Sequence, residues 1–356
     1  MRVGLVCPYS LTVPGGVQGQ VLGLARALRT LGHDVRVLAP SDGPPPDAGV
    51  TPLGKSIPMS SNGSLAPIAP DPSCALRTIR ALRDEAFDVV HLHEPFCPGP
   101  TLTSMLFTDR PLVGTFHRSG ASTAYAMLSP ATRRLVTRLQ VKFAVSPEAR
   151  ATAADALGGE YELVFNGIEI DHYAKATPTP ADGPTIFFVG RHEERKGLGV
   201  LLQAMSHLPS DVRLWVAGAG PQTDALKERT RDDARIEWLG RISEEEKASR
   251  IKGADIFCAP SLHGESFGIV LLEGMAAQTP IVASDLPGYR NVARPDVDAL
   301  LVPPGDPDAL AAALRRLFEE PQLAAALVRS GECRANELSM DRLAEQYVTY
   351  YERVIG

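Results

Sequence analysis

Short runs of apolar, often β-branched residues alternate with amphipathic stretches along most of the chain. In the first half the apolar runs lie at 3–7, 35–38, 89–93, 112–116, 142–145 and 162–165, and a helical pattern covers about 18–31. In the second half they lie at 185–190, 213–218, 235–240, 254–260 and 280–285, with helical patterns near 197–206, 221–232, 243–252, 268–277, 306–319, 321–335 and 339–354. Strands that alternate with helices predict right-handed βαβ units and parallel sheets, so the pattern indicates an α/β fold.

A break in this rhythm divides the chain. Residues 174–184 read AKATPTPADGP, which is poor in apolar residues and rich in proline, as is typical of a linker. We therefore predict one Rossmann-like domain at 1–175, a linker at 176–184, a second Rossmann-like domain at 185–338 and a last helical segment at 339–356. Ligands of open α/β sheets bind beyond the carboxyl ends of the strands, so two such domains predict a shared cleft.

Composition narrows the class of protein. The 356 residues exceed what one hydrophobic core usually supports, and 44% hydrophobic with 22% charged residues is ordinary for a globular enzyme. A net charge of -6 argues against a nucleic-acid partner. Five scattered cysteines without a CxxC pair favour a reducing compartment, and no signal sequence or long apolar segment is present. We expect a cytoplasmic protein that can still dock on a membrane surface.

Two glycine-rich segments lie where a phosphate could bind. PGGVQ at 14–18 follows the first predicted strand and precedes a helix, and Gly15 and Gly16 allow a close backbone approach to a ligand. GRHEERKG at 190–197 follows another strand and places the cations Arg191 and Lys196 beside a helix N-terminus. A structural turn and a solvated loop are the simpler explanations of these two segments. Neither segment has the GxGxxG spacing of a dinucleotide site.

The segment 263–284 is the most specific signal in the chain. Glu265 precedes the helix predicted at 268–277 and Glu273 lies about one turn inside it, among apolar residues. Carboxylates accept hydrogen bonds from sugar and ribose hydroxyl groups, and backbone N–H groups at a helix start suit a phosphate. Those N–H groups belong to Ser266, Phe267, Gly268 and Ile269. A preference for acidic residues near helix starts explains Glu265 but explains Glu273 less well.

Three further patterns have both structural and functional explanations. His117 follows the strand at 112–116, where it either contacts a sugar or serves only in packing. In HLHEP at 91–95 the two histidines share one strand face while Glu94 points away, so no metal site is expected. Arg77, Arg80 and Arg83 lie on one predicted helix, which is either a solvated face or a surface for anionic lipid.

Taken together, these motifs resemble those of retaining glycosyltransferases of GT-B fold, which consist of two Rossmann-like domains with parallel sheets facing across a cleft. The resemblance covers the whole chain and is greatest to the actinobacterial phosphatidylinositol mannosyltransferases. It rests on MRVGLVCPYS at 1–10, PGGVQ at 14–18, SNGS at 61–64, DVVHLHEP at 88–95, GTFH at 114–117, NGI at 166–168, GRHEERKG at 190–197 and CAPSLHGESFGIVLLEGMAA at 258–277. It also implies that the last helix crosses back onto the N-terminal domain.

The resemblance implies a role for each donor-side residue. Arg191 and Lys196 bind the diphosphate of the donor and assist its departure. Glu265 holds the transferred sugar, Glu273 holds the ribose, and His117 lies at the reaction face of the sugar. The remaining donor contacts that it implies are Gly15, Gly16, Ile242, Lys247, Ser266, Phe267, Gly268 and Ile269. The anomeric configuration is retained, no enzyme nucleophile takes part, and neither a metal ion nor a cofactor is required.

The acceptor side departs from that family. Where arginines that meet the lipid phosphate follow SNGS in the family, this chain reads LAPIAP at 65–70. Arg118 is the only cation soon after His117, and the basic helix is reduced to three arginines. The acceptor contacts that we expect are Tyr9, Gln18, Asn62 and Arg118. These departures leave the acceptor less defined than the donor.

We therefore expect a retaining, metal-independent hexosyltransferase that moves mannose from GDP-mannose to phosphatidylinositol or a related lipid or polyol, in the cytoplasm and at the inner face of the cell membrane. A transferase that uses a UDP-sugar and a soluble cyclitol or natural product is one alternative. A nucleotide-sugar-binding protein without turnover is another, and it is disfavoured because both motifs are intact. An NAD-dependent enzyme is disfavoured by the missing GxGxxG.

Overall fold

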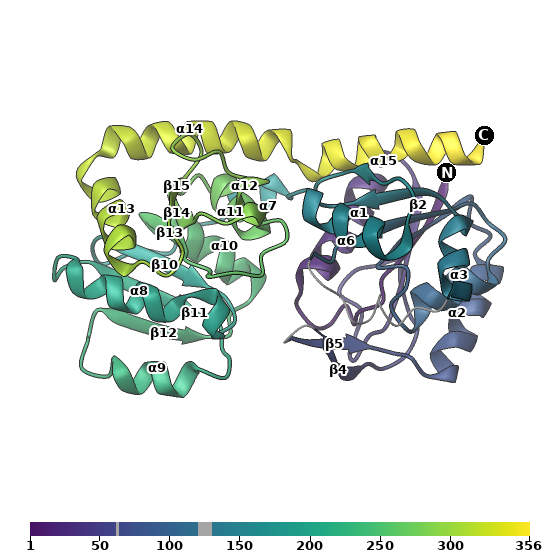
Figure 1. Cartoon of the computed structure of the whole chain (residues 1–356), viewed down its shortest axis with the longest axis horizontal. Coiled ribbons are helices and arrows are strands. Elements are labelled where there is room, and N and C mark those ends of the chain that lie inside the picture. The colour runs from purple at the N-terminus through teal and green to yellow at the C-terminus, as the bar shows by residue number, and fades with distance from the viewer. Residues whose placement is uncertain (62–63, 120–129) are drawn as a thin grey trace. The chain divides into compact units, whose positions relative to one another are not determined.

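The computed structural model describes residues 1–61, 64–119 and 130–356 of the chain (Figure 1). These residues form two compact units. Unit 1 contains residues 1–167 and 340–356, and unit 2 contains residues 168–339. Each unit has its own sheet, and within the described residues no helix is long and apolar enough to cross a bilayer.

Unit 1 is built around a parallel sheet with the strand order β3-β2-β1-β6-β7-β8-β9. Its strands are β1 (Arg2–Val6), β2 (Asp34–Ala39), β3 (Val50–Pro52), β6 (Val89–His93), β7 (Leu112–Phe116), β8 (Leu139–Ala144) and β9 (Glu162–Leu163). A separate antiparallel hairpin consists of β4 (Ile57–Ser61) and β5 (Ser64–Ile68). The central strands β6 and β7 are buried at every position, as expected for strands covered on both faces.

Helices cover both faces of this sheet, because alternate strand residues point to opposite sides. On one face, α1 and α15 pack on Val3, Leu5 and Val89, and α15 lies along α1 (Figure 1). On the other face, α2, α3 and α6 pack on residues such as Val6 and Leu92. The helices of unit 1 are α1 (Gly16–Thr30), α2 (Pro72–Asp84), α3 (Pro100–Phe107), α5 (Pro130–Leu135), α6 (Pro147–Leu157) and α15 (Met340–Ile355).

Unit 2 repeats the plan with a parallel sheet of order β12-β11-β10-β13-β14-β15. Its strands are β10 (Thr185–Val189), β11 (Arg213–Ala217), β12 (Ile236–Gly240), β13 (Ile256–Ala259), β14 (Ile281–Ser284) and β15 (Leu300–Val302). Its helices are α7 (Ile170–Ala174), α8 (Leu198–Ala204), α9 (Thr223–Arg229), α10 (Glu244–Gly253), α11 (Ile269–Ala276), α12 (Pro287–Arg290), α13 (Pro307–Glu319) and α14 (Pro321–Glu337). The prediction of two parallel-sheet domains is confirmed.

The structure adds elements that the pattern did not predict. Strands β3 and β15 have three residues each, and three residues are too few to show a hydrophobic periodicity in the sequence. The hairpin β4–β5 carries Pro58 opposite Pro67, residues that weigh against a strand unless it is peripheral. These additions lie at sheet edges or outside the sheets, so the predicted order of the central strands is unaffected.

The boundary between the units lies earlier in the chain than the predicted domain boundary at 175. The proline-rich segment 176–184, predicted as a linker, is grouped with unit 2. The backbone N–H of Thr179 donates to Ser249 O on α10 (3.0 Å), and a Cβ placed on Gly253 would lie only 2.2 Å from Thr179 O. This segment therefore packs closely on α10, which a linker composition does not reveal.

The chain passes between the units at two neighbouring points. In unit 1, the Gln20 side chain donates to Gly167 O (2.8 Å) and accepts from Gly167 N–H (2.9 Å), and a Cβ on Gly167 would lie 2.9 Å from Met340 Cα. In unit 2, the N–H of Ile168 donates to Leu338 O (3.0 Å). The first and last residues of unit 2 therefore lie side by side.

Candidate active site

A loop at the carboxyl end of β10 carries three cations. It runs from Gly190 to Gly197, and its last part forms a 3-10 turn at Glu194–Lys196. Gly197 follows with φ +69°, a conformation that favours glycine, and an added Cβ would lie 1.8 Å from Pro260 O. Only glycine lets this loop pack so closely on the segment that follows β13, which brings Lys196 to Glu265.

Lys196 and Glu265 form the centre of the site in unit 2. Lys196 Nζ lies 2.6 Å from Glu265 Oε1, and both side chains are mostly buried. Ser261 Oγ donates to the same oxygen (2.9 Å) and accepts from the hydroxyl of Tyr289 (3.0 Å). Burial raises the pKa of Tyr289 well above its ordinary value, with a further contribution from Glu265, so this hydroxyl keeps its proton as a donor. The chain of hydrogen bonds from Tyr289 fixes the direction of the Glu265 carboxylate.

Arg191 is joined to this centre through a carboxylate. Glu193 accepts from Arg191 Nη2 (2.9 Å) and from Arg195 Nε (3.0 Å), while Arg195 Nη1 lies 3.9 Å from Glu265 Oε1. Arg191 is 46% exposed, so its guanidinium remains accessible to a ligand. This cluster contains three cations (Arg191, Arg195 and Lys196) and two carboxylates (Glu193 and Glu265). Its net charge is therefore +1, which favours the binding of an anion.

A second ion pair lies one turn inside α11. Glu273 Oε1 lies 2.9 Å from Lys247 Nζ, which also contacts Glu244 Oε2 (2.6 Å) and lies over the ring of Tyr173 (5.8 Å). Burial alone would lower the pKa of Lys247, but Glu273, Tyr173 and Glu244 raise it above its ordinary value. The ammonium group therefore stays charged and holds Glu273 in place.

The start of α11 brings backbone donors next to Glu265. Gly268 is the residue before the helix and has φ +88°, a conformation that favours glycine. A Cβ on Gly288 would lie 2.0 Å from Glu265 O, so α12 packs tightly against this segment. The predicted backbone donors Ser266 and Phe267 lie in the turn that precedes Gly268, and Ile269 opens the helix. A helix start with adjacent cations is suited to a phosphate group.

In unit 1, His117 lies at the carboxyl end of β7 beside residues from β6. Its backbone N–H donates to Glu94 Oε1 (2.6 Å), and its ring Nε2 lies 3.0 Å from His93 Nδ1. Glu94 has φ +53°, which is uncommon for a residue with a side chain. Burial lowers the pKa of His117 to about 3, so the ring is neutral near pH 7. It cannot act there as a charged acid.

The predicted acceptor residues lie at the same edge of the unit 1 sheet, with one exception. Tyr9 lies close enough to Glu94 and Arg118 for their charges to act on it, and its pKa is raised well above its ordinary value, chiefly by burial. Gln18 is buried and its amide donates to Val13 O (3.1 Å) and Ser10 O (3.4 Å). Its amide N–H groups thus hold the loop before α1. Asn62 lies outside the described residues.

The two glycines at the start of α1, Gly15 before the helix and Gly16 as its first residue, have different surroundings. A Cβ on Gly15 would lie 2.4 Å from Gln18 Oε1, so the side chain of Gln18 occupies that space. A Cβ on Gly16 would meet no atom within 4 Å. The backbone at Gly16 is therefore open to an approaching group, whereas a side chain at Gly15 would have to displace the amide of Gln18.

The structure brings together some of the predicted residues and leaves others apart. Lys196 meets Glu265, Lys247 meets Glu273, and Ile242 lies in the loop between β12 and α10 without a specific polar contact. Sequence reasoning missed Glu193, Arg195, Ser261, Tyr289 and His93. Glu193 and Arg195 stand inside the GRHEERKG motif, so the charge alternation there was an available signal, whereas nothing in the sequence pairs Ser261 with Tyr289.

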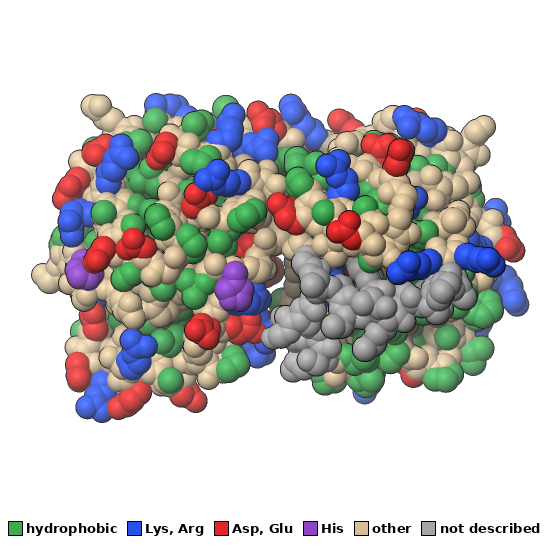
Figure 2. All heavy atoms as spheres, in the orientation of Figure 1, with side chains coloured by type: hydrophobic (Ala, Val, Ile, Leu, Met, Phe, Trp, Pro, Cys, Tyr) green, Lys and Arg blue, Asp and Glu red, His purple; other side chains and the backbone are tan. Residues whose placement is uncertain are grey.

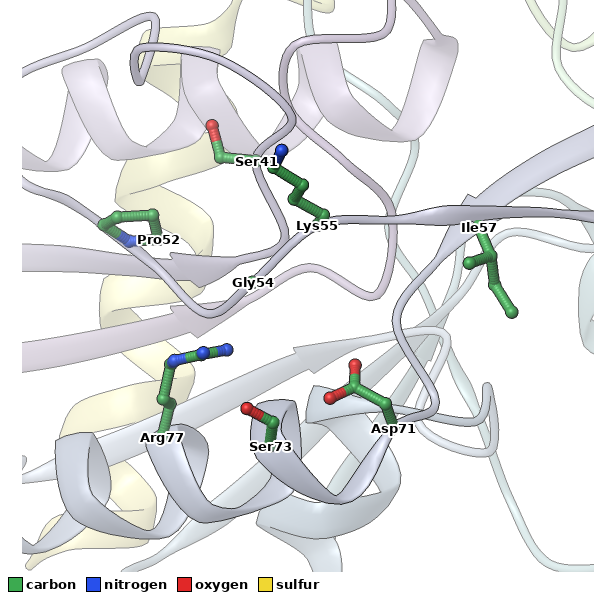
Figure 3. Close-up of a pocket in the computed structure, with 8 residues that line it drawn as sticks. All are labelled: Ser41, Pro52, Gly54, Lys55, Ile57, Asp71, Ser73 and Arg77. Atoms are coloured by element: carbon green, nitrogen blue, oxygen red, sulfur yellow. The ribbon is translucent and has the colours of Figure 1, made fainter.

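A pocket of about 580 Å³ opens elsewhere on unit 1, between the end of β3 and the first turn of α2 (Figure 3). Arg77 projects from α2 toward the segment after β3, where its Nη1 donates to Leu53 O (3.0 Å). The lining residues are Ser41, Pro52, Gly54, Lys55, Ile57, Asp71, Ser73 and Arg77. Within the described residues, no group of three or more His, Cys, Asp or Glu side chains is placed to hold a metal ion.

Two family models match the chain, one in each half. Residues 14–172 match "Glycosyltransferase Family 4" and residues 169–334 match "Glycosyl transferases group 1". The chain is 38% identical to the phosphatidyl-myo-inositol mannosyltransferase of Mycolicibacterium smegmatis, over 100% of this chain and 95% of the relative. It is also 38% identical to the protein of the same name from Mycobacterium leprae, over 99% and 97% of the two chains.

Solved structures show a similar fold. The Anabaena HepE protein in complex with UDP and glucose superposes with a TM-score of 0.76 at 19% identity, over 99% of this chain and 100% of that one. This likeness shows that both units follow the two-domain plan of glycosyltransferases. At such low identity it concerns the fold alone.

Proposed function

The chain belongs to the family of phosphatidyl-myo-inositol mannosyltransferases, and from this membership we propose that it is the glycosyltransferase that moves mannose from GDP-mannose to phosphatidylinositol. Full-length relatives at 37–38% identity support the sugar and the acceptor. The donor site is supported by one observation above all. Lys196 and Glu265, 69 residues apart in sequence, meet at 2.6 Å next to the start of α11.

In this proposal the diphosphate of the donor binds between the cations of the β10 loop and the start of α11. Negative charge develops on the diphosphate as its bond to the sugar breaks, and fixed cations and backbone N–H groups stabilise that charge. Arg191 is the cation with the most exposed guanidinium, so it moves from Glu193 to the phosphate at small cost. In this proposal these cations and the backbone N–H groups stabilise the diphosphate without a divalent ion.

We assign sugar and ribose recognition to the two carboxylates. Glu265 accepts hydrogen bonds from hydroxyl groups of the transferred mannose with the oxygen that is not taken by Lys196 and Ser261. Glu273 accepts from the ribose while Lys247 holds its other side. Both carboxylates are held by a cation, so they stay oriented as the donor enters.

The chemical step that we propose retains the configuration at the anomeric carbon. The bond from that carbon to the diphosphate oxygen breaks on the face where the acceptor hydroxyl attacks. The new bond to the hydroxyl oxygen forms on the same face, and the hydroxyl proton passes to the departing diphosphate. No side chain becomes covalently attached to the sugar, and the product is an α-mannoside.

Donor turnover in the presence of EDTA tests this function. The purified protein is offered GDP-mannose, UDP-glucose or UDP-N-acetylglucosamine, each with phosphatidylinositol vesicles or free inositol. We expect GDP-mannose consumption only with the vesicles, and NMR of the product should show the α-anomer. Transfer from a UDP-sugar to free inositol would contradict the donor and the acceptor. A β-anomer or a requirement for added Mg²⁺ would contradict the mechanism.

We further propose that unit 1 binds the membrane through α2 and the β4–β5 hairpin. Leu76, Ile57 and Met59 are 69%, 52% and 41% exposed. Hydrophobic side chains cover unit 1 over these elements in Figure 2. Arg77, Arg80 and Arg83 on α2 are exposed, and Arg80 pairs with Asp84 at 3.3 Å. Apolar side chains beside cations favour contact with an anionic lipid surface.

Neutralising two of these arginines is expected to weaken vesicle binding. Each basic residue near an anionic surface contributes about 1 kcal/mol, so Arg80→Gln with Arg83→Gln should weaken binding about 30-fold. Sedimentation with phosphatidylinositol-containing vesicles measures this, and GDP-mannose binding should not change. The matched control is Arg229→Gln with Arg231→Gln on unit 2. Equal vesicle binding by both double variants would contradict the proposal that α2 contacts the membrane.

A further inference from the structure

Three histidines of unit 1 form a buried column that ends at His117. His91 and His93 are two residues apart on β6 and therefore lie on the same face, where their rings stack with centroids 4.5 Å apart. The ring of His117 stacks on that of His93, with the centroids 5.2 Å apart. His91 and His93 are almost completely buried, and His117 is half-buried. The column therefore leads from the interior of the sheet to the edge where the predicted acceptor residues lie.

The interior end of this column is fully hydrogen-bonded. His91 Nδ1 lies 2.6 Å from the hydroxyl of Tyr351 on α15, and His91 Nε2 lies 2.7 Å from Thr115 Oγ1. Burial raises the pKa of Tyr351 well above its ordinary value, so its hydroxyl keeps its proton and is able either to donate to His91 Nδ1 or to accept from it. Thr115 Oγ1 is likewise able to donate or accept, so both ring nitrogens of His91 are satisfied in either tautomer. His91 has no ring nitrogen left for His93.

His93 has one partner among the described residues, which is His117. Its Nδ1 lies 3.0 Å from His117 Nε2, while its own Nε2 is buried and has no hydrogen-bond partner there. Burial lowers the pKa of His117 to about 3 and the pKa of His93 well below its ordinary value, so each neutral ring carries one proton. One of the two nitrogens that face each other is therefore the donor and the other is the acceptor.

The unpartnered nitrogen decides the direction of this hydrogen bond. If His93 Nδ1 were the acceptor, the His93 proton would be on Nε2, as a buried N–H without an acceptor. Such orphaned donors are rarer in folded proteins than unpaired acceptors. The favoured arrangement has the proton on His93 Nδ1, from which it is donated to His117 Nε2. The proton of His117 is then on Nδ1.

We propose that His93 is a positioning residue that holds His117 in its Nδ1–H form, so that His117 presents a permanent hydrogen-bond donor to an oxygen of the sugar or the acceptor. His117 Nδ1 makes no hydrogen bond to any described residue, which leaves it available to a ligand. Glu94 fixes the backbone of His117 at the same time, so both the ring and the main chain are oriented. In this role His117 donates a hydrogen bond throughout the neutral range and removes no proton.

The tautomer part of this proposal is tested without any substrate. Long-range proton–nitrogen correlation NMR on protein labelled with ¹⁵N-histidine distinguishes a protonated Nδ1 from a protonated Nε2, and His117→Gln identifies the signals of His117 by their loss. We expect His117 to be protonated on Nδ1 at pH 7. Protonation on Nε2 would overturn the proposal, whatever reaction the protein catalyses.

The catalytic part rests on the proposed function and uses two variants of His93. His93→Asn keeps an amide N–H near the position of Nδ1, whereas His93→Leu removes the donor and retains bulk. We expect the asparagine variant to keep the His117 tautomer and kcat within about threefold, and the leucine variant to mix the tautomers and lower kcat about 10- to 100-fold with little change in donor KM. His207→Leu, at an exposed histidine, is the control.

The results of these experiments test the tautomer part and the catalytic part of the proposal independently. If the NMR result is as expected but His93→Leu keeps full kcat, His93 sets the tautomer without serving catalysis, and the catalytic part is wrong. If no mannose is transferred, kcat is measured with whichever nucleotide sugar the protein turns over. The proposed function then fails while the tautomer result still stands.

Discussion

Replacing Lys196 by alanine is expected to lower kcat by about 100- to 1,000-fold, because in the proposed mechanism this side chain stabilises charge on the departing diphosphate. Its Nζ lies 2.6 Å from Glu265 Oε1, so the substitution also leaves the carboxylate that we assign to the sugar without its closest cation. We expect the loss mainly in kcat, since the charge that Lys196 meets grows as the bond breaks. Steady-state kinetics with GDP-mannose and phosphatidylinositol vesicles measures it.

The matched control for this variant is Lys175→Ala in the same unit. Lys175 is 74% exposed and pairs with Asp171 at 2.7 Å, and it lies outside the β10 loop. The Lys175→Ala substitution removes the same charge and the same side-chain volume as Lys196→Ala. Exposed ion pairs such as Lys175–Asp171 contribute little to the stability of the protein. Lys196→Ala with a kcat within threefold of the unmodified protein would show that another group meets the leaving diphosphate.

Replacing Gly197 by alanine is expected to have the largest effect on unit 2 as a whole. The added Cβ would lie 1.8 Å from Pro260 O, and the residue has φ +69°, which costs an alanine roughly 1–2 kcal/mol before any overlap is counted. The loop must then move away from the segment that follows β13. We expect the free energy of unfolding to fall by about 3 kcal/mol or more, and transfer activity to be lost with it.

Gly199, two residues later, provides the comparison. It lies inside α8, and an added Cβ would meet no atom within 4 Å. Alanine there should raise the free energy of unfolding by about 0.5–1 kcal/mol, since it favours the helix and restricts the unfolded chain. Calorimetry and activity of the two variants, measured side by side, test the prediction. Equal melting temperatures would mean that the close approach at Gly197 is not essential.

The sequence predicted the central strands because these strands are buried on both faces. Runs such as 186–189 and 256–259 are apolar throughout, so their hydrophobic pattern is not interrupted by polar residues from an exposed face. The hairpin β4–β5 was missed because each of its two strands carries a proline, and proline weighs against a strand. Short edge strands and hairpins are held by neighbours that a linear pattern does not contain.

The candidate site was predictable where its residues are close in sequence. Arg191 and Lys196 share one loop, and Glu265 and Glu273 bracket one helix start, so spacing alone grouped them. The residues that orient them are distant. Tyr289 reaches Glu265 through Ser261, and His91 meets a tyrosine 260 residues away. Such contacts depend on which helix covers which strand, and that information appears only with the tertiary structure.

The two neighbouring crossings of the chain make unit 2 a module that is inserted into unit 1. Ile168 N–H donates to Leu338 O, so the first and last residues of unit 2 are already side by side, and Gly167 packs on Met340 in the same way. Joining residue 167 to residue 340 by a short loop would therefore close unit 1 without displacing its last helix. In evolutionary terms, exchanging unit 2 between relatives would require one insertion, with only two adjacent junctions to preserve.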